Sequence, residues 1–408
     1  MAFRASLRLA AAARPAARRF YSQAATVPTS SASSVTGAQI HRDAALPNAD
    51  PAEDSASAAL VREHAPFMVA TYARPPPVFV KGEGSYLYDI ENRKYLDFTA
   101  GIAVNSLGHC DPEMSKLMAQ QAKTLVHASN LYYNPWTGAL SKLLIEKTLA
   151  SGGMHDAAAV FICNSGSEAN EAGIKFARKV GKVLDPSGTK TDIVSFRNAP
   201  FAPMVPGFRV GTLNDIAAIP SLVTPSTCSV LVEPIQGEGG VQPATDEFLL
   251  ALAKRCREVG ALLHYDEIQC GLSRTGSFWA HSEAHPDILT TAKALGNGFP
   301  IGATIVNANV AEKIKVGDHG TTFGGNPLAC RLAHYIVERL AEPGLLQGVK
   351  EKGSWRRIRE DREGGPGGLL VITAGTDTLR FVPSLVMSEA EIREGLGILE
   401  EAIKATRE

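Results

Sequence analysis

The sequence predicts an α/β fold in which a mostly parallel central sheet lies between two layers of helices, with a smaller α+β domain beside it. Three observations predict this fold. Short apolar strands alternate with helical segments through the middle of the chain, which is typical of parallel sheets covered by helices. The 408 residues exceed an ordinary single domain, so two domains are expected. Hydrophobic residues make up 45% of the chain, enough for a large core.

The first ordered elements are expected from about Leu60 onward. Alternating aromatic and aliphatic residues predict strands at Tyr86–Ile90 and Lys94–Phe98, joined by a turn at Glu91-Asn92. Two helices should follow, and each is predicted by a capping residue with a proline at the first helical position. The helix after Asp111-Pro112 has helical spacing at Met114, Leu117, Met118, Gln121 and Leu125. The helix after Asn134-Pro135 should point Leu140, Leu143, Leu144 and Leu149 inward.

The central sheet is predicted from the next segments. Strands are expected at Ala158–Cys163, Ser229–Val232 and Ala261–His264, and helices at Glu168–Val180 and Asp246–Val259. In sheets of this kind, ligands bind beyond the carboxyl ends of the strands. The motifs described below all follow such strands, so they are expected to form one site.

The N-terminal segment differs in composition from the rest of the chain. Residues 1–42 contain six arginines, no lysine and no acidic residue, among many alanines and serines. This pattern predicts a mitochondrial transit peptide over residues 1–21 and localisation to the mitochondrial matrix; a secretory signal would need an uninterrupted apolar segment, and a basic disordered tail is the alternative. Residues 22–58 are rich in Ser, Ala, Thr and Pro and are expected to form a disordered linker. Without residues 1–21 the net charge becomes −6, with 36 basic and 42 acidic residues.

Overall charge and cysteine content exclude several classes of protein. The 41 basic and 42 acidic residues argue against a nucleic-acid partner. No uncharged apolar stretch has the length of a membrane span, so no membrane insertion is expected. Six scattered cysteines without a C-x-x-C pair predict reduced thiols. His281 and His285 lack further ligands at suitable spacing, so no metal site is expected and both are interpreted as surface or structural histidines.

Three motifs carry candidate chemistry. Asn164-Ser165-Gly166-Ser167-Glu168 joins a strand to a helix, where small residues and free N–H groups suit a phosphate, although a simple helix cap is the commoner meaning. Asp266 ends a strand, where a buried carboxylate needs a partner. A protonated ring nitrogen would serve, but on this motif alone a pairing with Arg274 or with a backbone N–H is equally consistent. Lys293 stands alone among small and apolar residues, which lowers the pKa of an amine and makes it a nucleophile toward aldehydes.

The glycines after Lys293 have a second possible meaning. Gly296-x-Gly298 suggests a dinucleotide fingerprint, but no strand is expected immediately before it and Pro300 interrupts the helix that such a fingerprint needs. A phosphate cradle, a carboxylate for a ring nitrogen and a lysine for an aldehyde together indicate pyridoxal 5'-phosphate, which acts as an electron sink.

Several sequence blocks resemble the class-III aminotransferases, from about Leu60 to Glu408. The blocks are Gly101–His109, Asn164–Glu171, Glu233–Gly240, Asp266–Gln269, Arg274–Gly276 and His319–Pro327. The resemblance implies a fold-type I pyridoxal-phosphate transferase. Its large cofactor-binding domain would span residues 111–335, and its small domain would combine residues 59–110 with a shortened C-terminal part, residues 336–408.

The resemblance also implies roles for individual residues. Lys293 would bind the cofactor aldehyde and move the proton between two carbon atoms of the substrate, and Asp266 would keep the ring nitrogen protonated. The other cofactor contacts would come from Ser165, Gly166 and Ser167 at the phosphate, Gln269 at the ring hydroxyl, Ile268 on the ring face, and Thr322 from the neighbouring subunit of a homodimer. The substrate would be held by Tyr72 and Arg380, with Glu238 pairing with Arg380 when a basic substrate is bound.

Two blocks, Gly101–Asn105 and Thr376–Pro383, are most similar to family members that act on N-acetylornithine in the mitochondrial arginine biosynthesis of fungi. The implied substrates are N2-acetylornithine and 2-oxoglutarate. Ile102 lies where ornithine-specific relatives are expected to carry a tyrosine, which favours the acetylated substrate. Ornithine and 4-aminobutyrate are the alternative amino donors.

The sequence departs from the family pattern at two places. After the strand near Ile193–Phe196, the expected segment with a ring-stacking aromatic and a carboxylate-binding arginine has no counterpart, and Arg197-Asn-Ala199 runs directly into Pro200. A charged and then Gly-rich stretch, Ser354–Gly368, replaces a second expected block. A lost charge-assisted contact costs about 1.5–3 kcal/mol. A catalytically impaired relative that keeps the scaffold is therefore the second hypothesis.

Overall fold

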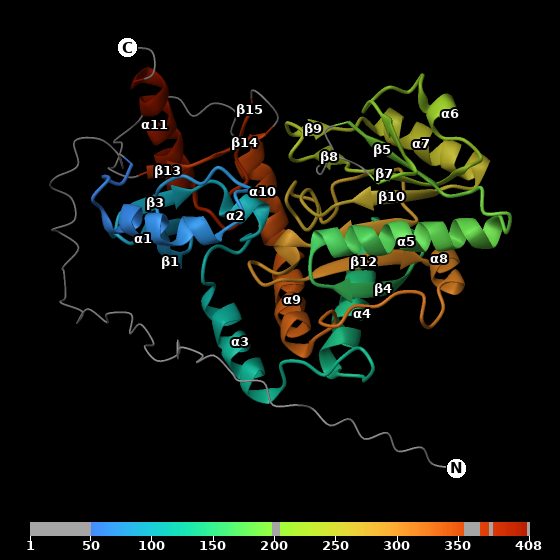
Figure 1. Ribbon diagram of the computed structural model, residues 1–408, viewed down its shortest axis with the longest axis horizontal. Coiled ribbons are helices and arrows are strands. Elements are labelled where there is room, and N and C mark those ends of the chain that lie inside the picture. The colour runs from blue at the N-terminus through green and yellow to red at the C-terminus, as the bar shows by residue number, and fades with distance from the viewer. Residues whose placement is uncertain (1–49, 198–204, 355–367, 375–377, 406–408) are drawn as a thin grey trace, which may run out of the picture. The chain divides into compact units, whose positions relative to one another are not determined.

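The computed structural model describes residues 50–197, 205–354, 368–374 and 378–405 (Figure 1). All of them belong to one unit, Leu46–Glu408, and the domain boundaries at residues 110 and 335 stay predictions. The predicted transit peptide and residues 22–49 of the predicted linker lie outside the described residues. None of the helices in the described part of the chain combines the length and the apolar character that crossing a membrane requires.

Seven strands form the central sheet, in the order β4-β12-β11-β10-β7-β5-β6. Strands β11, β10, β7, β5 and β6 are parallel, and only β12 runs antiparallel to both of its neighbours, β4 and β11. The predicted mostly parallel sheet is confirmed. The bounds are Ala157–Cys163 (β4), Asp192–Phe196 (β5), Phe208–Gly211 (β6), Thr227–Val232 (β7), Leu262–Asp266 (β10), Ile288–Thr291 (β11) and Gly302–Asn307 (β12).

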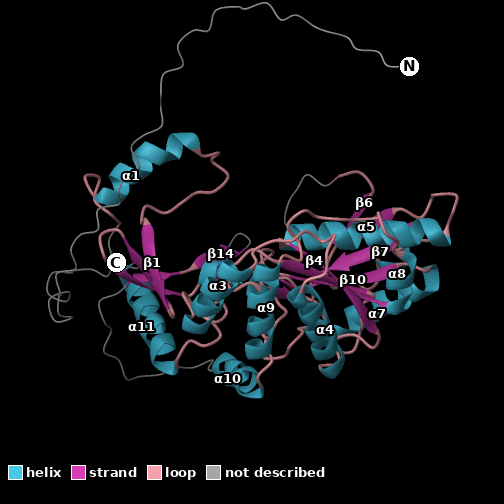
Figure 2. Cartoon of the chain, turned by 90° about the horizontal axis from the view of Figure 1, so that it is seen from below, coloured by secondary structure: helices cyan, strands magenta, loops and turns pink. Residues whose placement is uncertain are grey.

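Helices cover both faces of this sheet because its strands are apolar on both sides. Ile193 and Leu262 pack under helix α5 (Gly166–Leu184), whereas the next residues, Val194 and Leu263, pack under α7 (Asp246–Val259). Helices α4 (Pro135–Ala150) and α9 (Pro327–Leu340) cover β12 and β11 on the α7 side. Figure 2 shows α5 on one side of the strands and α4, α7 and α9 on the other.

The helix starts predicted at Asp111-Pro112 and Asn134-Pro135 are confirmed. Asp111 caps α3 (Pro112–Thr124) by accepting from the Met114 N–H at 2.8 Å, and Asn134 caps α4. The prediction that Leu149 points inward is wrong, since this side chain is 42% exposed. Leu140, Leu144 and Thr148 recur every four residues on the buried face, so position 149 falls a further 100° around the helix.

A second sheet joins the two ends of the described chain. The predicted hairpin forms β2 (Tyr86–Asp89) and β3 (Lys94–Asp97), flanked by β1 (Phe79–Glu83), and β13 (Gly368–Leu370) lies parallel to β3. Segments from both ends of the described chain therefore pair in this sheet. The remaining elements are α1 (Ala56–His64), η1 (Ala65–Phe67), α2 (Ala100–Ala103), α6 (Ile219–Leu222), β8 (Ile235–Gln236), β9 (Gln242–Pro243), η2 (Lys293–Leu295), α8 (Ala308–Lys313), α10 (Pro343–Ser354), β14 (Ile372–Ala374), β15 (Thr378–Arg380) and α11 (Glu389–Ala405).

The first helix among the described residues begins slightly earlier than the predicted ordered part of the chain. Helix α1 starts at Ala56, inside the segment predicted as linker, and Ser57 is buried. The Ser57 N–H and hydroxyl both donate to the Glu91 carboxylate, at 2.8 and 2.7 Å. These bonds tie α1 to the turn between β2 and β3.

Candidate active site

The predicted site residues meet at one edge of the central sheet. Ser165 follows β4, Asp266 ends β10, and Lys293 comes two residues after the end of β11. These three strands run in the same direction, so their carboxyl ends lie at the same edge. Glu233, which directly follows β7, lies at this edge as well.

Asp266 is a buried carboxylate held by two amide donors. Its Oδ2 accepts from Asn170 Nδ2 at 2.7 Å, and its Oδ1 accepts from the Ile268 N–H at 3.0 Å. Burial raises the pKa of Asp266, and the hydrogen bond from Asn170 opposes this rise. A cation placed against the carboxylate would stabilise its charged form.

Lys293 begins the short helix η2 with a left-handed backbone, φ 38°. Burial lowers the pKa of Lys293, while the neighbouring carboxylate of Glu238 opposes this and Arg380 adds to it. A lowered pKa leaves a larger fraction of the amine unprotonated, as a nucleophile requires. Strand β11 ends just before this residue, which the sequence did not reveal; no helix of the dinucleotide-binding kind follows Gly296.

Arg380, at the end of β15, reaches this edge from the C-terminal part of the chain. Its Nη2 donates to Glu238 Oε1 at 2.8 Å and its Nη1 to Gln269 Oε1 at 3.1 Å. The Arg380 side chain is 2% exposed, whereas that of Glu238 is 48% exposed. The buried arginine is thus fixed, and its carboxylate partner can move into solvent.

The predicted phosphate-binding segment lies at the N-terminus of α5. Ser165 caps this 19-residue helix by accepting from the Glu168 N–H at 3.2 Å. A Cβ atom on Gly166 would lie 2.7 Å from Ile268 Cδ1, so Ile268 packs directly on the first turn. The helix dipole favours an anion here.

Two predicted residues lie apart from this cluster. Tyr72 is 71% exposed, and its ring lies 5.6 Å from the Arg74 guanidinium carbon. Thr322 is exposed, while its neighbour Thr321 accepts from Asn164 Nδ2 at 3.1 Å. Among the described residues, no hydrogen bond joins Tyr72 or Thr322 to Lys293 or Asp266.

The first departure from the family pattern is visible in the sheet. Phe196 is buried against Phe248, with ring centroids 5.3 Å apart, so it is not available to stack on a ligand. Arg197 is exposed, and residues 198–204 lie outside the described part of the chain. Strand β6 then continues the sheet beside β5.

A family model decides the identity of the chain. The model described as aminotransferase class-III matches residues 68–201 and 210–359. The chain belongs to the class-III aminotransferases. The match is interrupted between residues 201 and 210 and ends at residue 359, at the two places where the sequence departs from the family pattern.

Individual relatives of this aminotransferase agree with the family match. The mitochondrial acetylornithine aminotransferase of Neurospora crassa is 64% identical, covering 99% of both chains. That alignment spans 462 positions, 54 more than the 408 residues of this chain, so the relative contains internal residues that are missing here. The succinylornithine transaminase of Yersinia pseudotuberculosis is 40% identical over 83% of this chain and 95% of the relative. The solved N-acetylornithine aminotransferase of Stenotrophomonas maltophilia K279a has a TM-score of 0.71 and 34% identity, covering 85% of this chain and 98% of that one.

The cofactor of this aminotransferase is pyridoxal 5'-phosphate, as in its family. The residues fit this group at three separate places. Asp266 is a buried carboxylate whose partners are neutral amides, so a cationic ring nitrogen would complete its surroundings. Lys293 provides a desolvated amine for the aldehyde, and the α5 N-terminus provides a site for the phosphate.

Three residues at this edge of the sheet were not identified as site residues from the sequence: Glu233, Asn170 and Thr290. Glu233 lies beside Asp266 because Val232 pairs with Tyr265 in the β7–β10 ladder. Burial and the nearby charge of Asp266 raise the pKa of Glu233 to about 8. Asn170 could have been suspected because it lies one helical turn after Gly166, on the same face of α5. The role of Thr290 depends on the order of the strands, which the sequence does not contain.

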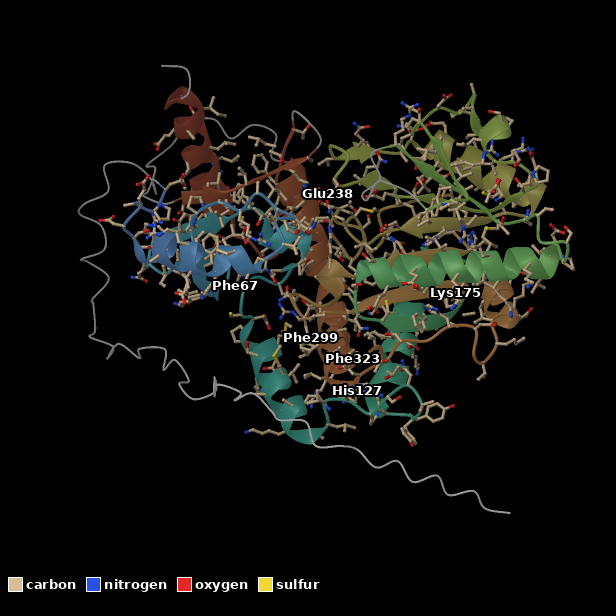
Figure 3. All side chains as sticks on the ribbon, viewed as in Figure 1. Phe67, His127, Lys175, Glu238, Phe299 and Phe323 are labelled. Carbon is tan, nitrogen blue, oxygen red and sulfur yellow. The ribbon has the colours of Figure 1, made fainter. Side chains whose placement is uncertain are left out.

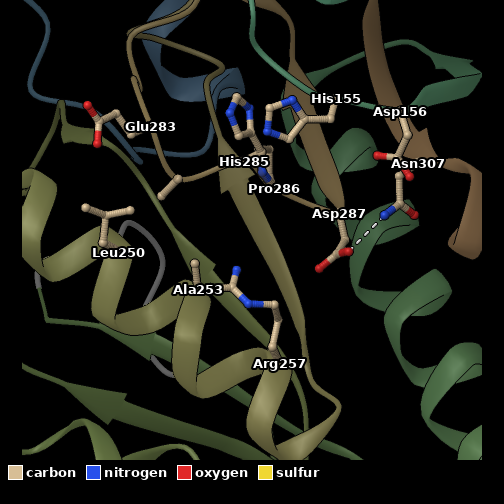
Figure 4. Close-up of a pocket in the computed structure, with 11 residues that line it drawn as sticks. His155, Asp156, Leu250, Ala253, Arg257, Glu283, His285, Pro286, Asp287 and Asn307 are labelled. Carbon is tan, nitrogen blue, oxygen red and sulfur yellow. Dashed lines mark hydrogen bonds between the residues drawn. The ribbon is translucent and has the colours of Figure 1, made fainter.

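A pocket of about 300 Å³ lies at the opposite edge of the sheet (Figure 4). Asp287, which immediately precedes β11, lines it together with His155, His285 and Arg257. Asp287 is held by the Leu263 N–H at 2.8 Å and by Asn307 Nδ2 at 2.9 Å. Since Lys293 follows the other end of β11, this pocket is separate from the candidate active site. His281, near His285, is buried and binds the Glu267 carboxylate, so the structural interpretation is correct for this histidine.

Proposed function

We propose that this aminotransferase moves the δ-amino group of N2-acetylornithine to 2-oxoglutarate, giving N-acetylglutamate 5-semialdehyde and glutamate, in arginine biosynthesis. The observation that carries the proposal is the Arg380–Glu238 pair beside Lys293. N2-acetylornithine and 2-oxoglutarate bind to the same site in turn. Only 2-oxoglutarate has a carboxylate directly next to the carbon atom that reacts. A buried arginine with a movable counter-ion serves both substrates.

The pair would act as follows. When 2-oxoglutarate or glutamate binds, its α-carboxylate displaces Glu238 and takes the Arg380 guanidinium in a charge-assisted contact. When N2-acetylornithine binds with its δ-amino group at the reacting carbon, Glu238 stays on Arg380 and neutralises it. Tyr72 is proposed to contact the far carboxylate of the acetylated substrate.

The remaining residues are proposed to serve the cofactor. Pyridoxal phosphate, when bound, withdraws electrons from the carbon that carries the transferred amino group. Asp266 would hold the proton on the ring nitrogen, Ile268 would pack on the ring and Gln269 would donate to the ring hydroxyl. Ser165, Gly166 and Ser167 would bind the phosphate through N–H and hydroxyl groups. Lys293 would bind the aldehyde and carry the proton between the two carbon atoms, which requires the lowered pKa that burial gives it.

The choice of an acylated amino donor is supported by Ile102. This residue is 38% exposed and lies in the segment before Leu107. Asn297 fastens that segment to the loop after Lys293, since it accepts from the Leu107 N–H at 2.8 Å and donates to the Gly108 carbonyl at 3.1 Å. An apolar side chain cannot pair with the free α-ammonium group of ornithine, whereas an acyl group needs no such partner. The Yersinia relative named for succinylornithine suggests that the acyl group can vary.

We also propose a homodimer with shared sites, in the mitochondrial matrix. Exposed apolar residues gather over the neighbouring segments 125–133 and 321–325, where His127 and Phe323 lie with ring centroids 5.7 Å apart (Figure 3). The group comprises Leu125, Val126, Leu131, Tyr132, Tyr133 and Phe323. A patch of this kind favours a protein partner, and the exposed Thr322 within it would reach the cofactor phosphate of the neighbouring subunit. The matrix location rests on the arginine-rich residues 1–21 and on relatives named mitochondrial.

The experiment is a substrate panel with the purified, cofactor-loaded enzyme. Glutamate formation from 2-oxoglutarate is measured with N2-acetylornithine, N2-succinylornithine, ornithine and 4-aminobutyrate as amino donors. The proposal predicts the largest kcat/KM for N2-acetylornithine, whereas a preference for ornithine or 4-aminobutyrate contradicts it.

A second candidate function is favoured by a specific observation. The Neurospora relative contains at least 54 positions without counterpart here, and the family match is interrupted beside β5. A chain that lost the aromatic and the arginine of that segment would bind the cofactor and lack turnover with any donor. The same panel, with no glutamate formed from any donor, identifies this candidate.

A further inference from the structure

Two short hydrogen bonds connect Asp266 to the interior of the sheet. Asn170 on α5 donates from Nδ2 to Asp266 Oδ2 at 2.7 Å. Thr290 on β11 donates from its hydroxyl to Asn170 Oδ1, also at 2.7 Å. Thr290 is fully buried and pairs with Asp266 in the β10–β11 ladder. The three side chains therefore form one connected chain of polar groups under the cofactor site.

The direction of these bonds follows from the groups themselves. A carboxylate only accepts, so the Asn170 amide must present its NH₂ group to Asp266 and its oxygen to Thr290. The single Thr290 proton then points at Asn170 Oδ1, at 2.7 Å, rather than at the more distant Tyr265 carbonyl, at 3.3 Å. The Thr290 oxygen is left to accept from another donor. His264 Nε2 lies 3.4 Å from this oxygen.

His264 lies at the inner end of this series of hydrogen-bonded side chains. It is completely buried against α5, where a Cβ atom on Gly173 would overlap its ring. Burial lowers the pKa of His264 to about 3, so the ring is neutral and carries one N–H. Its Nδ1 has no hydrogen-bond partner among the described residues, which places the N–H on Nε2, toward Thr290.

We infer that Asn170 and Thr290 are positioning residues for the cofactor: Thr290 orients the Asn170 amide, and Asn170 holds the Asp266 carboxylate in place for the ring nitrogen. The inference rests on the assignment of pyridoxal phosphate as cofactor and does not require N2-acetylornithine as the amino donor. Because Asn170 lies one turn after Gly166 on α5, the helix proposed to bind the phosphate also holds the carboxylate that would pair with the ring nitrogen.

The neighbouring residue offers a matched control. Thr291 follows Thr290 on β11 and is equally buried, but its hydroxyl has no hydrogen-bond partner in the described residues. Thr290→Val and Thr291→Val therefore make the same change in volume and polarity at adjacent positions, and only the first removes a hydrogen bond to Asn170. Thr290→Ser restores the hydroxyl, and Asn170→Ala removes the direct donor to Asp266.

The test measures cofactor binding first. The dissociation constant of pyridoxal 5'-phosphate is determined by absorbance titration of the apoenzyme for the wild type and the four variants. Loss of a hydrogen bond that orients a charged group predicts a constant about 3- to 10-fold higher in Thr290→Val. An effect at least as large is expected for Asn170→Ala. Thr290→Ser and Thr291→Val should stay within about twofold of the wild type, the scatter expected when no polar contact is lost.

Kinetics with the best amino donor provide the second readout. Positioning of Asp266 predicts a lower kcat in Thr290→Val with KM for the amino donor unchanged, and recovery in Thr290→Ser. Equal cofactor constants in Thr290→Val and Thr291→Val would overturn the inference, as would a wild-type constant in Asn170→Ala. If no donor is turned over, the proposed function fails, and the cofactor constants still decide the role of Thr290.

Discussion

Replacing Glu238 with Gln tests the proposed exchange of partners at Arg380. The substitution keeps the shape and hydrogen-bonding capacity of the side chain and removes its charge. In the structure Arg380 Nη2 lies 2.8 Å from Glu238 Oε1, and the arginine stays attached to Gln269 at 3.1 Å. The arginine is therefore expected to remain in place when its counter-ion is neutralised.

The expected magnitude follows from the exposure of the two partners. A hydrogen bond to a charged group contributes about 1.5–3 kcal/mol when buried, but exposed ion pairs contribute about 0–1 kcal/mol. The Arg380 side chain is 2% exposed and that of Glu238 is 48% exposed. An intermediate contribution of about 1 kcal/mol corresponds to roughly a fivefold change in a binding constant.

The two substrates should respond in opposite directions. 2-Oxoglutarate no longer displaces a competing carboxylate, so its KM should fall about fivefold. When the amino donor is bound to the Glu238→Gln variant, Arg380 has no charged partner, so the KM of the amino donor should rise by about the same factor. The assay is steady-state glutamate formation with each substrate varied in turn. Glu283→Gln, an exposed residue at the other edge of the sheet, makes the same charge change and should leave both values unaltered. KM values that move in the same direction would refute the exchange.

Three further predictions concern stability and the cofactor. Leu144→Ala should lower the free energy of unfolding by about 3 kcal/mol and Leu149→Ala by less than about 1 kcal/mol, because only Leu144 is fully buried; comparable losses in urea titrations would contradict the assignment of the inner face of α4. Since the pKa of Glu233 is raised to about 8 in the folded apoenzyme, its carboxyl costs stability as pH rises above its usual range. Glu233→Gln should therefore raise the Tm of the apoenzyme relative to wild type at pH 7.5 and have little effect near pH 4.5; a difference that does not depend on pH would contradict this. Lys293→Arg should still bind pyridoxal phosphate, but borohydride treatment should attach none of it to the chain, whereas the wild type should be labelled; labelling of the variant would mean that another lysine binds the aldehyde.

The sequence predicted the parts of the fold whose signals are local. Proline after a capping residue located the starts of α3 and α4, and the strand predicted at Ala158–Cys163 differs from β4 only by its first residue. Strands β11 and β12 were missed. Ile288–Thr291 is only four residues long, and Gly302–Asn307 begins with small residues next to Pro300. Their pairing between β4 and β10 stabilises them as strands in the folded protein.

The same distinction applies to the site. Lys293 and Asp266 could be predicted because each is a charged residue at the end of an apolar run. Thr290 and Glu233 could not, because their importance comes from lying beside Asp266 on the two neighbouring strands of the sheet. For Asn170 the spacing from Gly166 gave a signal, but its bond to Asp266 depends on how α5 packs on the sheet. The contributions of Tyr72 and Thr322 depend on segments that are exposed in the single chain, and they stay predictions.

The most direct measurement of the proposed function is the visible absorption spectrum of the enzyme loaded with pyridoxal phosphate, before and after N2-acetylornithine is added without 2-oxoglutarate. We expect a yellow band that bleaches when the amino donor is added and returns when 2-oxoglutarate follows. A band that persists unchanged would contradict the proposed activity. It would mean that Lys293 and Asp266 hold the cofactor in a chain that no longer recognises this substrate.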